Sequence, residues 1–173
     1  CGAFVAAAGT IQQIRLPYSL FIYAVLWRNL IVFGHHAAVY GVIVVIFSVP
    51  VNANSLLLLV GLFFLCLNGV WIGLMVGALT TRFRDVQPLL ASMLQILLFV
   101  TPVFWPPELL ARRVALLVDL NPFYHFVAIV RAPLLGQAPE ALSWYAVVAV
   151  TVVGWTLTVF VFGRVRDRLP YWL

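Results

Sequence analysis

The chain has 173 residues, of which 65% are hydrophobic and only 9% are charged, and its formal net charge is +5. Soluble domains contain about a quarter charged residues, so this composition excludes an ordinary soluble protein. The positive charge comes from arginine alone, because the chain contains no lysine. Most of the arginines lie at the ends of apolar runs, where membrane topology explains them more simply than nucleic-acid binding does.

The first residue is Cys1, which indicates that this sequence is not a complete translation product. An acylated cysteine left after signal removal is one interpretation, and a chain cut upstream is the other. Nothing before Gln12 resembles a charged signal start followed by an apolar core. We therefore expect N-terminal spans to be missing. The two cysteines provide neither a disulfide framework nor a metal-ligand spacing.

The apolar runs predict an all-α membrane protein with four crossings. A bilayer core is about 30 Å thick, so roughly 20 apolar residues cross it as a helix. A short amphipathic segment comes first and is closed by Pro17. The predicted segments, in chain order, are Thr10–Leu16, a long helix from Tyr18 to Val49 whose span is Leu30–Val49, Ser55–Leu79, Val86 to about Trp105, and Ala141–Phe162.

The stretch from Pro106 to Gly136 predicts two short helical pieces, Pro107–Val118 and Pro122–Leu135. Asn121 is the expected N-cap of the second piece, with Pro122 at its first position and Gly136 after its end. Each piece is too short to cross a bilayer. A re-entrant hairpin between the last two crossings is one interpretation, because broken helices at membrane depth need protein or a water-filled cavity. A pair of amphipathic helices on the outer membrane surface is the alternative.

The distribution of arginine predicts that both ends of the chain lie in the cytoplasm. If the four crossings alternate, six arginines fall on one side: Arg15, Arg82, Arg84, Arg164, Arg166 and Arg168. Three fall on the other side, where acidic residues match them: Arg112, Arg113 and Arg131, with Glu108, Asp119 and Glu140.

The motif RFRD precedes the third crossing. Arg82 and Arg84 are typical of a positive anchor at the lipid headgroups, with Asp85 as the N-cap of the next helix. A cytoplasmic gate is the functional alternative, and the two are compatible.

Ionisable residues also occur inside the first long helix. Arg28 lies near the start of the span, where its side chain can reach the interface. His35 and His36 point about 100° apart on a helix, so they cannot form a one-face metal pair. A pore-facing position or an interhelical hydrogen bond is the favoured interpretation, and proton relay is the alternative.

Aromatic residues gather around the proline break after the third crossing: Phe99, Phe104, Trp105, Phe123 and Tyr124. An interfacial aromatic belt explains such residues in any membrane protein. The sharper hypothesis is a stacking surface for sugar rings at the outer end of a channel, formed by Phe104, Trp105 and Tyr124. Replacing Trp105 by Ala is then expected to reduce export without affecting assembly.

The order of TIQQIRLP, TTRFRDV, LLFVTPVFWP, LNPFYHFVAIVRAPLLG and a closing RLPYWL resembles the permease subunit of type-2 ABC exporters, and within them the polysaccharide and O-antigen export branch. This resemblance covers essentially the whole chain. It implies one transmembrane permease domain over residues 1–173, lacking an N-terminal interface helix, the first span and most of the second.

The resemblance also implies a homodimer with a central channel, a separate ATPase subunit and export of a lipid-linked glycan across the inner membrane of a Gram-negative bacterium. The segment that matches the ATPase-coupling helix is Thr10, Ile11, Gln12, Gln13, Ile14 and Arg15. ATP and Mg would bind in the partner, and we expect no cofactor in this chain. A phosphate-binding loop of the GxxxxGK[ST] type needs a lysine, which the chain lacks.

Two alternatives differ from polysaccharide export. One is a type-2 ABC exporter of a drug or small lipid. The other is a membrane-embedded acyl- or glycosyltransferase that uses His125 or the histidine pair near a lipid substrate. The scattered carboxylates indicate no hydrolytic constellation, so we predict no catalytic and no metal-binding residues.

Overall fold

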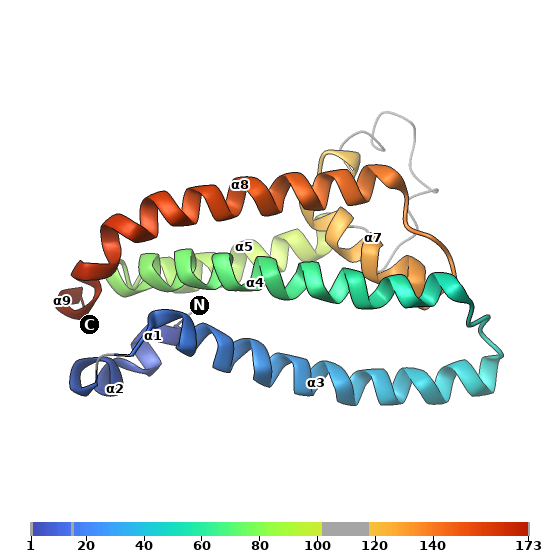
Figure 1. The fold of residues 1–173 in the computed structure, drawn as a ribbon, viewed down its shortest axis with the longest axis horizontal. Helices are drawn as coiled ribbons and strands as arrows, with labels where there is room; N and C mark the ends of the chain where they lie inside the picture. The colour runs from blue at the N-terminus through green and yellow to red at the C-terminus, as the bar shows by residue number, and fades with distance from the viewer. Residues whose placement is uncertain (1, 15, 102–117, 173) are drawn as a thin grey trace. The chain divides into compact units, whose positions relative to one another are not determined.

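The computed structural model describes residues 2–14, 16–101 and 118–172, which form helices and connecting turns with no strand among them (Figure 1). The prediction of an all-α membrane protein is confirmed. The helices are α1 (Ala3–Ala6), α2 (Ala8–Gln13), α3 (Tyr18–Phe47), η1 (Ala53–Leu56), α4 (Leu57–Arg82), α5 (Val86–Val100), α7 (Pro122–Leu134), α8 (Ala141–Val165), η3 (Arg166–Arg168) and α9 (Leu169–Trp172).

Three of the described helices are long and apolar enough to cross a membrane, namely α3, α4 and α8. They contain 30, 26 and 25 residues, and at about 1.5 Å per residue each exceeds the 30 Å bilayer core. The apolar helix α5 has 15 residues and is followed by residues outside the described part of the chain. The structure therefore supports the first, second and last predicted crossings by length and describes the start of the third.

Local sequence explains where α3 ends and α4 begins. Ser48 follows α3 with a positive φ of 50°, and Pro50 then prevents the helix from continuing. The side-chain oxygen of Asn52 accepts a hydrogen bond from the backbone amide of Asn54 at 3.1 Å, and the backbone amide of Asn52 donates to the Ser55 hydroxyl at 3.4 Å. These reciprocal bonds cap η1 and start the next helix.

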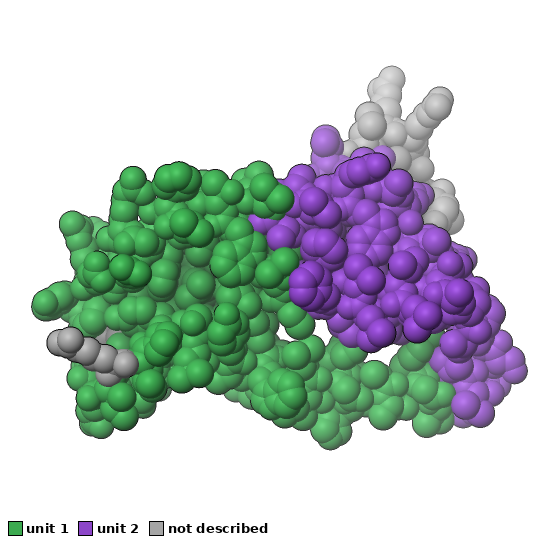
Figure 2. All heavy atoms as spheres, viewed as in Figure 1, with its two compact units in different colours: residues 1–42, 66–90, 152–173 green, residues 43–65, 91–151 purple. Residues whose placement is uncertain are grey.

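The chain divides into two compact units, which Figure 2 shows in green and purple. Unit 1 comprises Cys1–Val42, Cys66–Leu90 and Val152–Leu173, and unit 2 comprises Ile43–Leu65 and Ala91–Thr151. The helices α3, α4, α5 and α8 each contribute residues to both units. The described arginines that the sequence assigns to the cytoplasm all belong to unit 1: Arg82, Arg84, Arg164, Arg166 and Arg168.

In unit 1, a row of glycines on α4 lets other segments approach closely. A Cβ added to Gly69 would lie 2.6 Å from Leu26, one at Gly73 would lie 2.6 Å from Ile22, and one at Gly77 would lie 2.8 Å from Phe4. Glycines four residues apart share one helix face and favour helix–helix contact in membranes. The core cluster beside them consists of Phe4, Ile11, Ile22, Val70, Leu74, Ala78 and Leu169.

In unit 2, the short helix α7 packs against the first half of α4. The closest approach is at Gly61, where an added Cβ would lie 2.8 Å from the carbonyl oxygen of Ile129. The predicted end of α7 is confirmed, because Gly136 follows it with a φ of +73°. The carbonyl oxygen of Gly136 accepts hydrogen bonds from the side-chain amides of Asn52 at 2.8 Å and Asn54 at 3.3 Å. These bonds tie the α3–α4 turn to the end of α7.

Several threonine hydroxyls inside the long helices are satisfied by the backbone of their own helix. The hydroxyl of Thr81 donates to the carbonyl of Gly77 at 2.8 Å, and Thr151 and Thr158 make the same bond one turn back at 2.7 and 2.8 Å. These buried hydroxyls therefore carry little desolvation cost.

Candidate functional site

The predicted coupling segment begins in α2, which is an amphipathic helix. Ile11 is 9% exposed and belongs to the core cluster of unit 1. Thr10, Gln12 and Gln13 are exposed, and Ile14 ends the helix in an extended conformation. Arg15 lies outside the described residues. The segment thus has one buried anchor and an uncovered polar surface, as a docking element requires.

Aromatic contacts connect this part of the chain to two long helices of unit 1. The ring of Phe4, which belongs to the same core cluster as Ile11, meets Tyr18 at the start of α3 with a centroid distance of 5.7 Å. Tyr18 in turn meets Phe162 of α8 at 6.0 Å. Both pairs are edge-to-face, the geometry that aromatic rings favour.

The RFRD motif lies at the end of α4, where Arg82 is the last helical residue. Its guanidinium carbon lies 5.0 Å from the ring centroid of Trp172 and 5.2 Å from that of Phe83. Arg84 and Asp85 are exposed. Asp85 directly precedes α5, but no amide of the described residues donates to its carboxylate, so the expected N-cap hydrogen bond is not formed. The gating role of the motif stays a prediction.

The sequence analysis did not identify Trp172 as a contact of Arg82. The closing YWL entered only as part of the family resemblance, and ninety residues separate Trp172 from Arg82. No local pattern predicts a contact over that distance. Trp172 packs against the core cluster that contains Ile11. The coupling segment and Arg82 are therefore connected to the same core.

The predicted channel exit is only partly described. Phe104 and Trp105 lie outside the described residues. Tyr124 lies on α7, is half-buried, and meets the ring of His125 edge-on at 5.4 Å. The start of α7 agrees with the prediction, because Asn121 is its N-cap, Pro122 is at the first position, and the Asn121 side chain accepts a bond from the amide of Phe123 at 3.0 Å.

His125 connects three segments of unit 2. Its Nε2 lies 2.8 Å from the carbonyl oxygen of Asp119, which can only accept, so Nε2 donates. Its Nδ1 then accepts from the hydroxyl of Ser143, 3.1 Å away at the start of α8. His125 and Ser143 are 3% and 1% exposed. With both ring nitrogens engaged in a buried position, His125 acts as a cross-link, and this geometry does not favour the transferase alternative.

A polar cavity of about 420 Å³ lies beside Tyr124. Its polar and aromatic lining comes from α7, the following turn and the start of α8: Tyr124, Arg131, Gln137, Glu140 and Ser143. A guanidinium, an amide, a carboxylate and a hydroxyl can donate to or accept from hydroxyl groups, and an aromatic ring adds an apolar face. This combination suits a carbohydrate.

The helix α3 carries a polar stripe, defined here as Arg28, Asn29, His35 and His36, all of which are exposed. Residues seven apart point in nearly the same direction on a helix, so Arg28 aligns with His35 and Asn29 with His36. The Nδ1 of His35 lies 2.8 Å from the carbonyl of Ile31 on the same helix. The interhelical hydrogen bond considered from the sequence is not formed by His35 in the described residues. Those residues also contain no group of three or more potential metal ligands.

The described residues form long apolar helices and no strand, which defines a multi-pass membrane protein. Comparison with protein families then identifies which one: the model of the ABC-2 type transporter matches residues 13–135, well over half of the chain. The chain belongs to this family and is a membrane permease component of an ABC transporter. No curated protein matches it. The matched region contains α3, α4, α5 and α7, and thus the RFRD motif, the polar stripe and the polar cavity's α7 side.

Proposed function

We propose that the chain is the channel-forming permease of an ATP-driven exporter of a lipid-linked polysaccharide in the inner membrane of a bacterium. Family membership provides the transporter class. The similarity of TTRFRDV, LLFVTPVFWP, LNPFYHF and RLPYWL to the polysaccharide branch supports the cargo. Two copies would enclose the channel, and a separate ATPase would bind ATP and Mg and dock at Thr10–Arg15.

The polar stripe on α3 is the observation that carries the proposal. Ionisable side chains at membrane depth are costly unless they face protein or a water-filled cavity. In this chain His35 and His36 lie inside the predicted span, and both are exposed. His36 makes no hydrogen bond or ion pair with the described residues, and His35 bonds only to the carbonyl of Ile31 on its own helix. A hydrophilic channel between two copies provides the water that these groups need. A small apolar cargo would need no such lining.

The polar cavity supports a sugar as the cargo. Tyr124 of α7 contributes an aromatic face to the cavity. Gln137 and Glu140, which lie between α7 and α8, contribute hydrogen-bonding groups. The predicted exit residue Tyr124 thus lies among groups that recognise hydroxyls. A growing or moving glycan would make transient contacts of this kind without one fixed binding pose.

The test compares Tyr124→Ala with Tyr145→Ala, each supplied to cells from which the gene of the full-length protein has been deleted. Tyr145 is exposed near the start of α8, but it does not line the cavity. We expect Tyr124→Ala to lower surface glycan severalfold and to raise intracellular lipid-linked glycan, whereas Tyr145→Ala behaves like the unaltered protein. Normal surface glycan in cells that lack the permease altogether would refute the polysaccharide cargo.

A further inference from the structure

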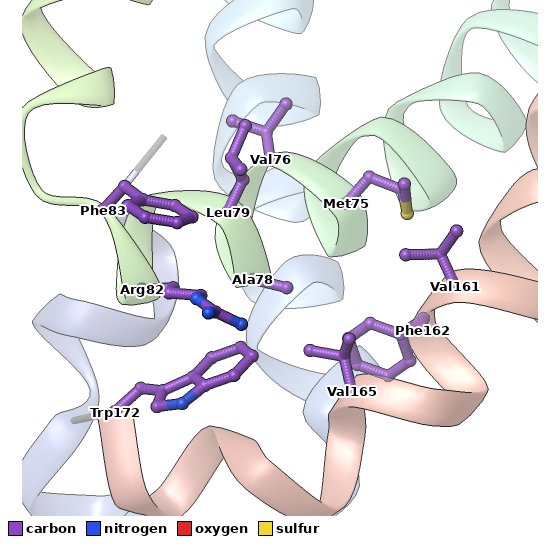
Figure 3. A pocket seen from close by; sticks show the side chains of 10 residues that line it. All are labelled: Met75, Val76, Ala78, Leu79, Arg82, Phe83, Val161, Phe162, Val165 and Trp172. Atoms are coloured by element: carbon purple, nitrogen blue, oxygen red, sulfur yellow. The ribbon is translucent and has the colours of Figure 1, made fainter.

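Unit 1 contains an apolar groove of about 320 Å³ at the end of α4 (Figure 3). Met75, Leu79, Phe162 and Val165 are among the apolar side chains that line it, and Trp172 closes one side. Of the described residues in the lining, Arg82 alone is charged. An apolar cavity with one cation at its edge is complementary to a hydrocarbon chain with an anionic head.

The geometry of Arg82 supports an anion as its partner. Figure 3 shows the guanidinium beside the Trp172 indole, and its central carbon lies 5.0 Å from the ring centroid. A stacked guanidinium keeps its N–H donors in its own plane, where they can form two parallel bonds to a phosphate. No carbonyl or carboxylate of the described residues accepts a bond from Arg82. By contrast, Arg164 donates to the carbonyl of Phe160 at 2.8 Å, and Arg166 lies 3.5 Å from Asp167.

We propose that this groove binds an anionic phospholipid of the membrane, with its phosphate on Arg82 and part of one acyl chain between α4 and α8. Basic pockets between transmembrane helices on the cytoplasmic side commonly hold anionic headgroups. The predicted topology places Arg82 on that side. The groove shares no lining residue with the polar stripe or the polar cavity, so we assign it to a bound lipid and not to the exported cargo.

The groove also adjoins the core that anchors α2. Phe162, Val165 and Trp172 line the groove and pack against the cluster containing Ile11 and Leu169. A lipid seated there would support the packing behind the predicted ATPase-docking segment. We therefore expect bound phospholipid to stabilise the permease as well as to remain with it during purification.

The headgroup contact is tested by native mass spectrometry of the full-length permease in mild detergent with added phosphatidylglycerol or phosphatidylcholine. We expect the unaltered protein to retain phosphatidylglycerol preferentially. Arg82→Gln should weaken retention about tenfold or more, as expected for losing charge-assisted hydrogen bonds. Arg166→Gln is the matched control, because Arg166 is an exposed arginine of the same unit that does not line the groove. Equal losses in both variants would indicate diffuse attraction and overturn the proposal.

The acyl-chain contact needs a separate pair of variants. Val161→Trp fills the groove, whereas Val159→Trp changes an exposed position of α8 that does not line it. We expect only Val161→Trp to reduce phosphatidylglycerol retention and to abolish the rise in melting temperature on adding this lipid. If Val161→Trp leaves phosphatidylglycerol retention unchanged, something else covers the groove. If the protein retains a prenyl carrier in place of phospholipid, the proposed occupant is wrong. Either result overturns the proposal.

Discussion

At the scale of single residues, a few polar side chains hold α7 within largely apolar surroundings. Asn121 caps the helix through its carbonyl oxygen and donates from its amide to the hydroxyl of Thr101 at 3.0 Å. His125, one turn later, joins Asp119 to Ser143. Because buried polar groups without partners are costly, these bonds select one position for α7.

Replacing His125 by Ala is expected to destabilise the protein. The Ser143 hydroxyl and the Asp119 carbonyl would lose their partner, at a cost of about 1–3 kcal/mol for each buried group left unpaired. His36→Ala is the matched control, because His36 is exposed on α3. Thermal unfolding in detergent should show a lower midpoint for His125→Ala alone. Equal midpoints for the two variants would contradict the cross-linking role of His125.

Sequence reasoning succeeded at this scale where the signal is local. Asn121, Pro122 and Gly136 each lie within one turn of the helix end that they define, and the structure confirms all three positions. The contacts of His125 with Ser143 and of Arg82 with Trp172 join distant segments. Nothing in the spacing of those residues indicates which helix meets which.

At the scale of whole helices, glycines on α4 determine how closely neighbours approach. Gly61 faces the backbone of α7, whereas Gly69, Gly73 and Gly77 face side chains from α3 and α1. The interval of four residues was present in the sequence and is a known sign of helix contact. It was not used in predicting the fold, although it identifies the packed face of α4.

Gly61→Ala is expected to disturb the α4–α7 contact in unit 2. The new methyl group would lie 2.8 Å from the Ile129 carbonyl oxygen, so the helices must separate. Overpacking of this kind costs about 1–3 kcal/mol. Gly41→Ala on α3 meets no atom within 4 Å and should be neutral or slightly stabilising, since alanine favours helix. Melting temperatures in detergent distinguish the two, and a neutral Gly61→Ala would contradict the packing.

Helix boundaries were predicted well where proline adjoins the helix. The helix α3 begins at Tyr18 as expected and ends at Phe47, two residues before the predicted end. The helix α8 begins at Ala141 and continues to Val165, beyond the predicted Phe162. Gly163 did not stop it, because a single glycine weakens a helix by about 1 kcal/mol without breaking it. The predicted piece Pro107–Val118 lies almost entirely outside the described residues.

At the scale of the molecule, composition alone determines the class. Long apolar helices could be predicted because about 20 apolar residues are needed to cross a bilayer. The ABC-2 match, the polar stripe on α3 and the amphipathic α2 anchored by Ile11 are the observations on which the proposed function rests. We propose above all that a separate ATPase docks at α2 and drives this permease.

The most direct test is purification of the tagged full-length permease co-expressed with its candidate ATPase subunit. We predict a stable complex with ATPase activity. Exchanging the exposed pair Gln12 and Gln13 for glutamate should release the ATPase without lowering the permease's melting temperature, because neither side chain is buried. Gln137→Glu, an exposed glutamine on another segment, should leave the complex intact. A permease that captures no ATPase, or a complex unaffected by the double exchange at α2, would contradict the account.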